Sequence, residues 1–200
     1  MKLIKINKKK RIFISILILI FSFYSWTKAD DIRDFQIEGM SLGDSALLFF
    51  DEKTLEQNKE EDWFEDKSYV PIAELKLKNS EIYTSFQIHV KNNDSKYIMK
   101  SISGFIFYKN NIDECYKKLD SIVSDIENLF SDIKNFGKNN YKHNWDKSGK
   151  STITDVILED NNGYQISVQC YDWSKDLPYW DSLRITIDTK EFNDWLIKAR

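Results

Sequence analysis

The chain of 200 residues contains 32 acidic and 29 basic side chains, but seven of the basic ones and none of the acidic ones lie in its first 29 residues. Residues 30–200 therefore carry a formal net charge of −10, and a domain this acidic is repelled by nucleic acid and by anionic lipid surfaces. With only two histidines and two cysteines, none of them at ligand spacing, the chain does not build a zinc site.

The first 29 residues have the pattern of a secretory signal peptide. A basic stretch that ends at Arg11 is followed by an apolar run over residues 12–26, and then by the small residues Thr27 and Ala29 before a cleavage point. The apolar run is shorter than the roughly 20 residues that span a membrane. We therefore expect cleavage before Asp30, export to the periplasm or beyond, no membrane span afterwards, and a single domain over residues 30–200. An uncleaved N-terminal anchor is the alternative.

The start of the predicted domain contains the first candidate site, a turn of small and polar residues: Glu38, Gly39, Met40, Ser41, Gly43, Asp44 and Ser45. Ser41 or Asp44 can cap a helix that we predict over residues 41–57. Ser41 also lies in a G-x-S-x-G pattern, but too few residues precede it for the parallel sheet that positions a nucleophilic serine in that motif. We therefore treat that match as coincidental.

The tripeptide Gly43-Asp44-Ser45 resembles the first sequence block of the GDS(L)-type esterases. The resemblance implies that Ser45 is the nucleophile and that a late Asp-x-x-His motif supplies its histidine, and the chain lacks that motif. Without a positioned base, a serine hydroxyl is a poor nucleophile. A serine esterase that uses Ser45 is therefore the alternative function rather than the main one.

Three strands are predicted next, from the alternation of apolar and polar residues. The first covers residues 70–78. The second covers residues 82–90 and places His89 on its more solvated face. The third, over residues 97–108, has apolar residues on both faces, which is typical of a central strand. Gly104 in this strand marks a bulge or a close backbone approach.

The longest predicted helix covers residues 111–136, where apolar residues recur every seven positions and form a broad apolar face. Asn111 and Glu114 predict a capping box at its start, and Gly137 fits the position after its last turn. A polar loop then extends to residue 150 and contains two aromatic rings and a histidine: Tyr141, His143 and Trp145.

The rest of the chain predicts a hairpin of residues 152–159 and 164–173, a strand over residues 183–187 and a helix over residues 189–198. Together these elements predict an α+β fold. We expect an antiparallel sheet of about five to six strands, packed on one face by the long central helix, with a short N-terminal helix and a C-terminal helix.

The two cysteines, Cys115 and Cys170, both lie on apolar faces of their predicted elements. An exported protein folds in a compartment where disulfides form, so the two residues are a candidate disulfide. Two buried thiols are the alternative, because cysteine is among the most buried residue types.

Aromatic residues around Leu177 and Pro178 form the second candidate site: Tyr171, Trp173, Tyr179 and Trp180. Exposed rings of this kind stack on sugars or anchor a protein partner. The alternative is a loop that folds back on the core and uses its rings for packing.

Two segments carry a further resemblance. Residues 35–45 read Phe-Gln-Ile-Glu-Gly-Met-Ser-Leu-Gly-Asp-Ser, and Ile102-Ser103-Gly104 precedes Tyr-Lys-Asn at 108–110 and Ile-Asp-Glu-Cys-Tyr at 112–116. In this order they resemble a family of small exported proteins of unknown function from AT-rich marine alphaproteobacteria, over residues 34–130. The entry into the first helix is also similar to small outer-membrane-assembly lipoproteins of the BamE type, although this chain is longer and has no cysteine near the cleavage point for lipidation.

The resemblance implies an envelope location and assigns no activity. Together with the absence of an assembled catalytic motif, it favours a non-catalytic binding or structural module of the cell envelope. We expect no cofactor, and a partner that is either an envelope protein or a small envelope ligand.

Overall fold

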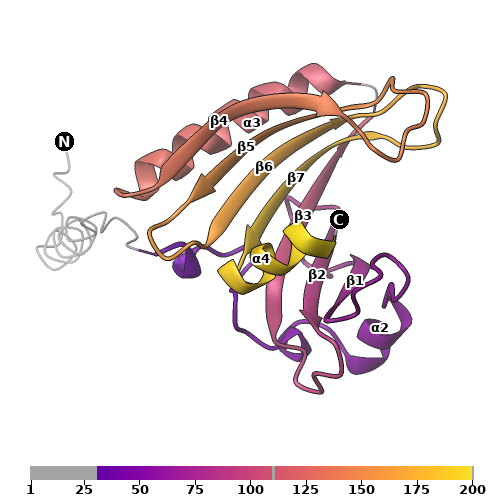
Figure 1. Ribbon diagram of the computed structural model, residues 1–200, viewed down its shortest axis with the longest axis vertical. Coiled ribbons are helices and arrows are strands. Elements are labelled where there is room, and N and C mark those ends of the chain that lie inside the picture. The colour runs from indigo at the N-terminus through magenta and orange to yellow at the C-terminus, as the bar shows by residue number, and fades with distance from the viewer. Residues whose placement is uncertain (1–30, 110, 200) are drawn as a thin grey trace, which may run out of the picture.

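The computed structural model describes residues 31–109 and 111–199, so the predicted signal peptide lies outside the described residues. The described residues form an α+β fold with three α-helices and one seven-stranded antiparallel sheet (Figure 1). The elements are α2 (Glu52–Gln57), β1 (Tyr69–Leu75), β2 (Ser85–Lys91), β3 (Met99–Tyr108), α3 (Ile112–Leu129), β4 (Lys134–Lys142), β5 (Thr152–Glu159), β6 (Gln165–Asp172), β7 (Asp181–Asp188) and α4 (Lys190–Ala199).

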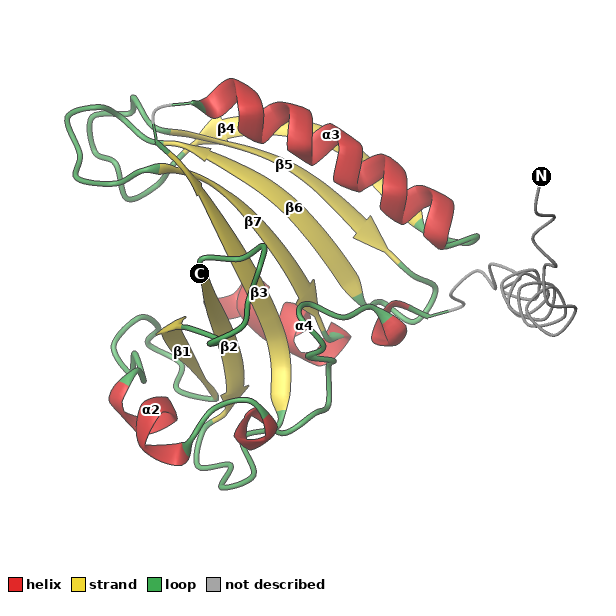
Figure 2. Cartoon of the chain, turned by 180° about the vertical axis from the view of Figure 1, so that it is seen from behind, coloured by secondary structure: helices red, strands yellow, loops and turns green. Residues whose placement is uncertain are grey.

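The strand order β1-β2-β3-β7-β6-β5-β4 explains how one long helix crosses the sheet. Three consecutive strands build one half, and α3 then carries the chain from the centre of the sheet to its far edge, where β4 begins (Figure 2). Three further antiparallel connections return the chain until β7 pairs with β3, with Ile102 opposite Ile187. The third predicted strand is therefore central, as its apolar residues on both faces indicate.

The main core lies between α3 and one face of the sheet, which we name the first face. Leu119 and Ile126 of α3 and Ile166 and Val168 of β6 are almost fully buried in it. Burying one such side chain stabilises the fold by about 1.5–3 kcal/mol. The apolar period of α3 and the alternation of β6 therefore meet at this face, which confirms the prediction of a helix packed on a sheet.

The predicted helix over residues 111–136 is too long, because α3 ends at Leu129. Phe130 adopts an extended conformation, and the residues that were predicted as a polar loop form the edge strand β4. An edge strand with polar side chains on both faces has no alternation to reveal it. Gly137 lies within β4 at a positive φ of 84°, where the register shifts, rather than at the end of the helix.

The predicted N-terminal helix over residues 41–57 is also wrong. Its residues form a single turn of 3-10 helix at Ala46–Leu48 and then the short α2. The reason is a competing set of hydrogen bonds: Gly43 N–H donates to Met99 O at 3.0 Å, and Ala46 N–H donates to Tyr97 O at 2.9 Å. These donors bind the chain at the start of β3, so they are not used for a helix of their own.

The opposite face of the sheet, the second face, is covered by α4 over β1 and β2. Phe192 and Trp195 of α4 pack on Tyr69, and the ring of Phe192 lies 4.6 Å from that of His89. His89 is therefore buried, and its prediction on a solvated strand face is wrong because α4 shields that face.

Two predictions about single positions are confirmed. A Cβ added to Gly104 would lie 2.5 Å from the ring of Tyr83, so a close approach requires glycine there. Cys115 of α3 and Cys170 of β6 form a disulfide with a Cα–Cα distance of 6.0 Å, within the ordinary range for such bonds. Within the described ranges, no helix is long and apolar enough to cross a membrane.

Candidate functional site

The aromatic residues of the second candidate site lie together with rings from two other segments. We name this set the aromatic surface: Phe107, His143, Trp145, Tyr171, Trp173, Tyr179 and Trp180. It is built at one end of the sheet from β3, the end of β6, and the loops β4–β5 and β6–β7. Phe107 of β3 and Tyr171 of β6 are both paired with Ser182 of β7, which lies between them. Paired residues point to the same face of a sheet, and this face is the second face.

The rings form two groups of ring contacts, one around Trp173 and one between Phe107 and Trp180. Trp173 is central: its ring centroid lies 4.4 Å from that of His143, 4.7 Å from that of Tyr179 and, in a stacked arrangement, 6.2 Å from that of Tyr171. On the other side, the edge of one ring meets the face of the other between Phe107 and Trp180, 6.4 Å apart. The prediction placed four of these rings in one loop, and the structure adds three from elsewhere in the sequence.

Several of these rings are exposed although they are large and apolar. Trp145 is 72% exposed, and Tyr179 and Trp180 are each 55% exposed. Next to them, an open pocket of about 370 Å³ is lined by Trp173, Lys175, Leu177, Pro178, Tyr179 and Trp180. Trp173 itself is half-buried. The inner rings therefore serve packing, as the alternative interpretation expects, while the outer rings form an accessible apolar surface.

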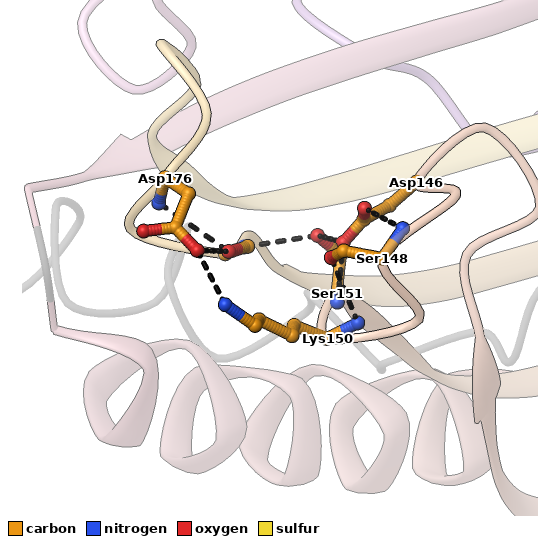
Figure 3. A network of polar contacts seen from close by, with 6 residues as sticks. Asp146, Ser148, Lys150, Ser151 and Asp176 are labelled. Atoms are coloured by element: carbon orange, nitrogen blue, oxygen red, sulfur yellow. Dashed lines mark hydrogen bonds and ion pairs between the residues drawn. The ribbon is translucent and has the colours of Figure 1, made fainter.

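The two loops that carry the rings are joined by buried polar contacts around Asp146 and Ser151 (Figure 3). The Ser151 hydroxyl donates to Asp146 Oδ2 at 2.7 Å, and its oxygen accepts the Ser174 N–H at 2.9 Å. Asp146 Oδ2 also accepts the Ser151 N–H at 2.8 Å. Ser151 thus connects the β4–β5 loop to the β6–β7 loop, and its side chain is fully shielded from solvent.

Further contacts fix the same two loops from outside. Asp146 Oδ1 accepts the Ser148 N–H at 2.8 Å, and hydrogen bonds from Ser148 and then Ser151 hold the pKa of Asp146 well below its usual range. The Lys150 ammonium lies 2.6 Å from Asp176 Oδ2 (Figure 3). That pair is exposed and adds little stability, so the buried serines carry the connection.

His143 is held as a neutral ring within the aromatic surface. The Trp145 N–H donates to His143 Nδ1 at 3.2 Å, which leaves the ring proton on Nε2. Burial lowers the pKa of His143, and the nearby Asp146 opposes part of this shift. The ring therefore acts as a packing group between two tryptophans at neutral pH.

A loop from the other edge of the sheet reaches the same place. The rings of Trp63 and Trp145 meet edge to face at 6.3 Å. Trp63 precedes β1, and Trp145 follows β4, and these strands are opposite edges of the sheet. This ring contact therefore links two loops that flank opposite edges of the sheet. Nothing in the local sequence around Trp63 or Phe107 marks this proximity, which arises only from the tertiary fold.

The first candidate site, residues 38–45, lies elsewhere and has a structural role. Glu38 and Gly39 have positive φ values in a tight turn that lets Ile37 and Met40 bridge each other. The segment then pairs with the start of β3 at Met99, whereas the aromatic surface lies at the other end of this strand, near Phe107. Eight residues of strand separate the two places by roughly 27 Å.

The remaining polar residues of that turn have hydrogen-bond partners within the described chain, and Ser41 Oγ accepts the Gln36 Nε2–H at 3.1 Å. Asp44 Oδ2 accepts the Ser41 N–H at 3.1 Å. Ser45 Oγ donates to Lys96 O at 2.5 Å and accepts the Leu47 N–H at 3.3 Å, so it caps the 3-10 turn. The hydrogen bonds of Ser45 within the described chain include none to a histidine. This geometry gives no support to an esterase.

In the parts of the chain that the structure describes, no group of three or more His, Cys, Asp or Glu side chains is arranged to hold a metal ion. The aromatic surface is therefore the candidate site, and its chemistry is that of noncovalent contact: flat rings, a few polar edges and no activated nucleophile. Comparison of the chain with protein-family models, curated proteins and solved structures gives no match to any of them.

Proposed function

We propose that this protein is an exported, non-catalytic binding module of the cell envelope and that it binds through the aromatic surface. The export part of the proposal rests on the sequence of the first 29 residues. The binding part rests on one observation: exposed aromatic rings lie on two loops that the buried contacts of Ser151 and Asp146 join to each other.

Fixed rings favour binding because less conformational freedom is lost when a ligand docks. Immobilising a flexible side chain at an interface costs roughly 0.5–1.5 kcal/mol, and rings that are already held by neighbours avoid much of this cost. Tyrosine and tryptophan also bury a large area and keep a polar edge for hydrogen bonding. Binding energy at interfaces is concentrated in a few residues, often tryptophan and tyrosine.

The test is a crosslinking pull-down from native envelope extract with the chain expressed in full and purified after export. The first variant carries Tyr179→Ala and Trp180→Ala, which removes the two exposed rings beside the pocket. The matched control carries Leu48→Ala and Ile197→Ala, which removes two large exposed side chains that lie outside the aromatic surface. All three proteins are first compared by thermal unfolding.

The proposal expects a specific partner that the wild type and the control variant recover and that the ring variant loses. Recovery of the same partner by all three proteins would show that binding uses another surface. If none of the proteins recovers a partner, the search moves to small ligands, with the indole N–H signals of Trp145 and Trp180 as the readout and the buried Trp195 as an internal control. An absence of ligand-induced shifts there would refute the proposal in favour of a purely structural component.

A further inference from the structure

Arg184 lies on the second face of the sheet, in the middle of β7. Its Nε donates to Ser103 Oγ and Thr186 Oγ1 at 3.1 Å, and its Nη2 donates to Ser103 Oγ at 2.9 Å. The guanidinium carbon lies 5.3 Å from the centroid of the Phe105 ring. Two hydroxyls and one ring therefore fix the plane of the guanidinium group.

The charge of Arg184 has no carboxylate partner among the ion pairs of residues 31–109 and 111–199. The Nη1 atom of Arg184 makes no hydrogen bond within that part of the chain. It is also not among the solvent-inaccessible side-chain atoms that lack a hydrogen-bond partner, so Nη1 is accessible to solvent. A half-buried guanidinium is normally paired, because leaving its charge partly desolvated is unfavourable. Here the unused donors face outwards.

The position of Arg184 connects it to the aromatic surface. Phe105 and Phe107 on β3 lie opposite Arg184 and Ser182, and Gln169 and Tyr171 on β6 lie opposite the same two residues from the other side. The rings of Phe105 and Phe107 are 6.4 Å apart and nearly parallel. Rings thus continue from the guanidinium of Arg184 towards Trp180 at the end of the sheet.

We propose that Arg184 is the anion-binding end of the aromatic surface and that the ligand is an amphipathic organic anion. Its flat apolar body packs on Phe107 and Trp180, and its carboxylate accepts hydrogen bonds from the free N–H groups of Arg184. The planar fork of a guanidinium matches a carboxylate, and charge-assisted hydrogen bonds are stronger than neutral ones. This inference rests on the proposed function, because it names the ligand class of the same surface.

Other charges on the second face are compatible with this assignment. The backbone of Asp155 lies two strands away from that of Arg184, roughly 10 Å across the sheet. The backbone of Asp188 lies four residues further along β7, roughly 13 Å away. Asp155 Oδ2 accepts the Tyr141 hydroxyl at 2.8 Å. His89 carries no charge at neutral pH, since burial and then the positive charge of Arg184 lower its pKa to about 3.

The test compares two ligands that differ only in the anionic group: 4-phenylbutyrate and 4-phenylbutanamide. Arg184 and Ser182 are two residues apart in β7, about 7 Å, and Ser182 is paired with Phe107. The ring of either ligand can therefore reach Phe107 while its head group lies at Arg184. Affinities are measured by NMR titration of the protein purified after export, with the Arg184 Nε–H and Trp180 indole N–H signals as readouts. Three variants are compared with the wild type: Arg184→Gln, Arg184→Lys and Phe107→Ala.

We expect the wild type to bind the carboxylate about 10–100-fold more tightly than the amide, the range that one charged hydrogen-bonded contact supports. In Arg184→Gln the two ligands become equal, and the amide affinity does not change, which also shows that the variant is folded. Arg184→Lys keeps a smaller preference for the carboxylate. Phe107→Ala weakens both ligands by a similar factor and keeps their ratio.

The two proposals can fail separately. Equal binding of both ligands by the wild type, with shifts at Trp180, would overturn the role of Arg184 and leave the aromatic surface as a binding site. The carboxylate ligand could instead shift the Arg184 signal and leave the Trp180 signal unchanged, with the same affinity in Phe107→Ala. This result would overturn the use of the aromatic surface. If neither ligand shifts any of these signals at millimolar concentration, the assignment of this ligand class is wrong.

Discussion

The disulfide between Cys115 and Cys170 gives a quantitative prediction about stability. The bond closes a loop with a sequence separation of 55 residues, which contains most of α3, all of β4 and β5, and most of β6. In the chain-entropy model, a crosslink over a loop of this length stabilises the folded state by about 4 kcal/mol, because it restricts the unfolded chain. Reduction should remove that contribution.

The assay is urea unfolding of one protein in oxidised form and after complete reduction, so that no side chain differs between the samples. For a urea dependence of about 2 kcal/mol per M, the loss of about 4 kcal/mol lowers the unfolding midpoint by about 2 M. The Cys115→Ala, Cys170→Ala double variant is the control, since the reductant should not change its midpoint. A reduced protein whose midpoint lies within about 0.5 M of the oxidised one would refute the loop-closure reasoning.

The disulfide also links stability to the candidate site. Cys170 points to the first face, where α3 lies, and the next residue, Tyr171, points to the second face and joins the aromatic surface. The crosslink therefore fixes the part of β6 from which the rings emerge. Beyond the stability loss, we expect reduction to broaden the NMR signals of Tyr171 and Trp173, and unchanged signals at these rings would show that the disulfide does not order the site.

Three further predictions concern single residues. Ser151→Ala leaves the Ser174 N–H without its acceptor and should lower the free energy of unfolding by about 1–3 kcal/mol, or the melting temperature by roughly 2–12 °C in calorimetry. His89 has a pKa of about 3 when folded and about 6.5 when unfolded, so the free energy of unfolding should fall by about 1.4 kcal/mol for each pH unit below 6. Denaturation curves of His89→Gln at several pH values should show a smaller dependence of the free energy of unfolding on pH. Gly104→Ala should cost about 1–3 kcal/mol, and adding Tyr83→Ala should give a non-additive recovery in a double-mutant cycle.

The elements that could be predicted from sequence are those with one buried and one solvated side. The alternation in residues 164–173 and 183–187 predicts β6 and β7, and the seven-residue period predicts most of α3, because burial on one side imposes a period. The edge strand β4 was missed because none of its residues is buried, so burial imposes no pattern on it. Strand β4 is the additional strand beyond the predicted five to six.

The candidate site could be predicted only in part. The sequence places Tyr171, Trp173, Tyr179 and Trp180 within ten residues of one another, so their proximity needs no tertiary information. Trp145 and His143 approach them because β4 and β6 flank β5 in the sheet, and that order depends on recognising β4. The turn at residues 38–45 stays a prediction as a binding site, and the structure shows that Asp44 and Ser45 make hydrogen bonds that build the turn itself.

Arg184 shows why a binding residue in a strand is hard to recognise from sequence. Ser182, Arg184 and Thr186 alternate with buried aliphatic residues, which is the ordinary pattern of a strand with one solvated face. In this fold the Phe105 ring and the hydroxyls of Ser103 and Thr186 cover part of the side chain at that position. These contacts leave Arg184 half-buried, and the ion pairs of residues 31–109 and 111–199 include no counterion for its charge. The ligand proposed above would supply that counterion.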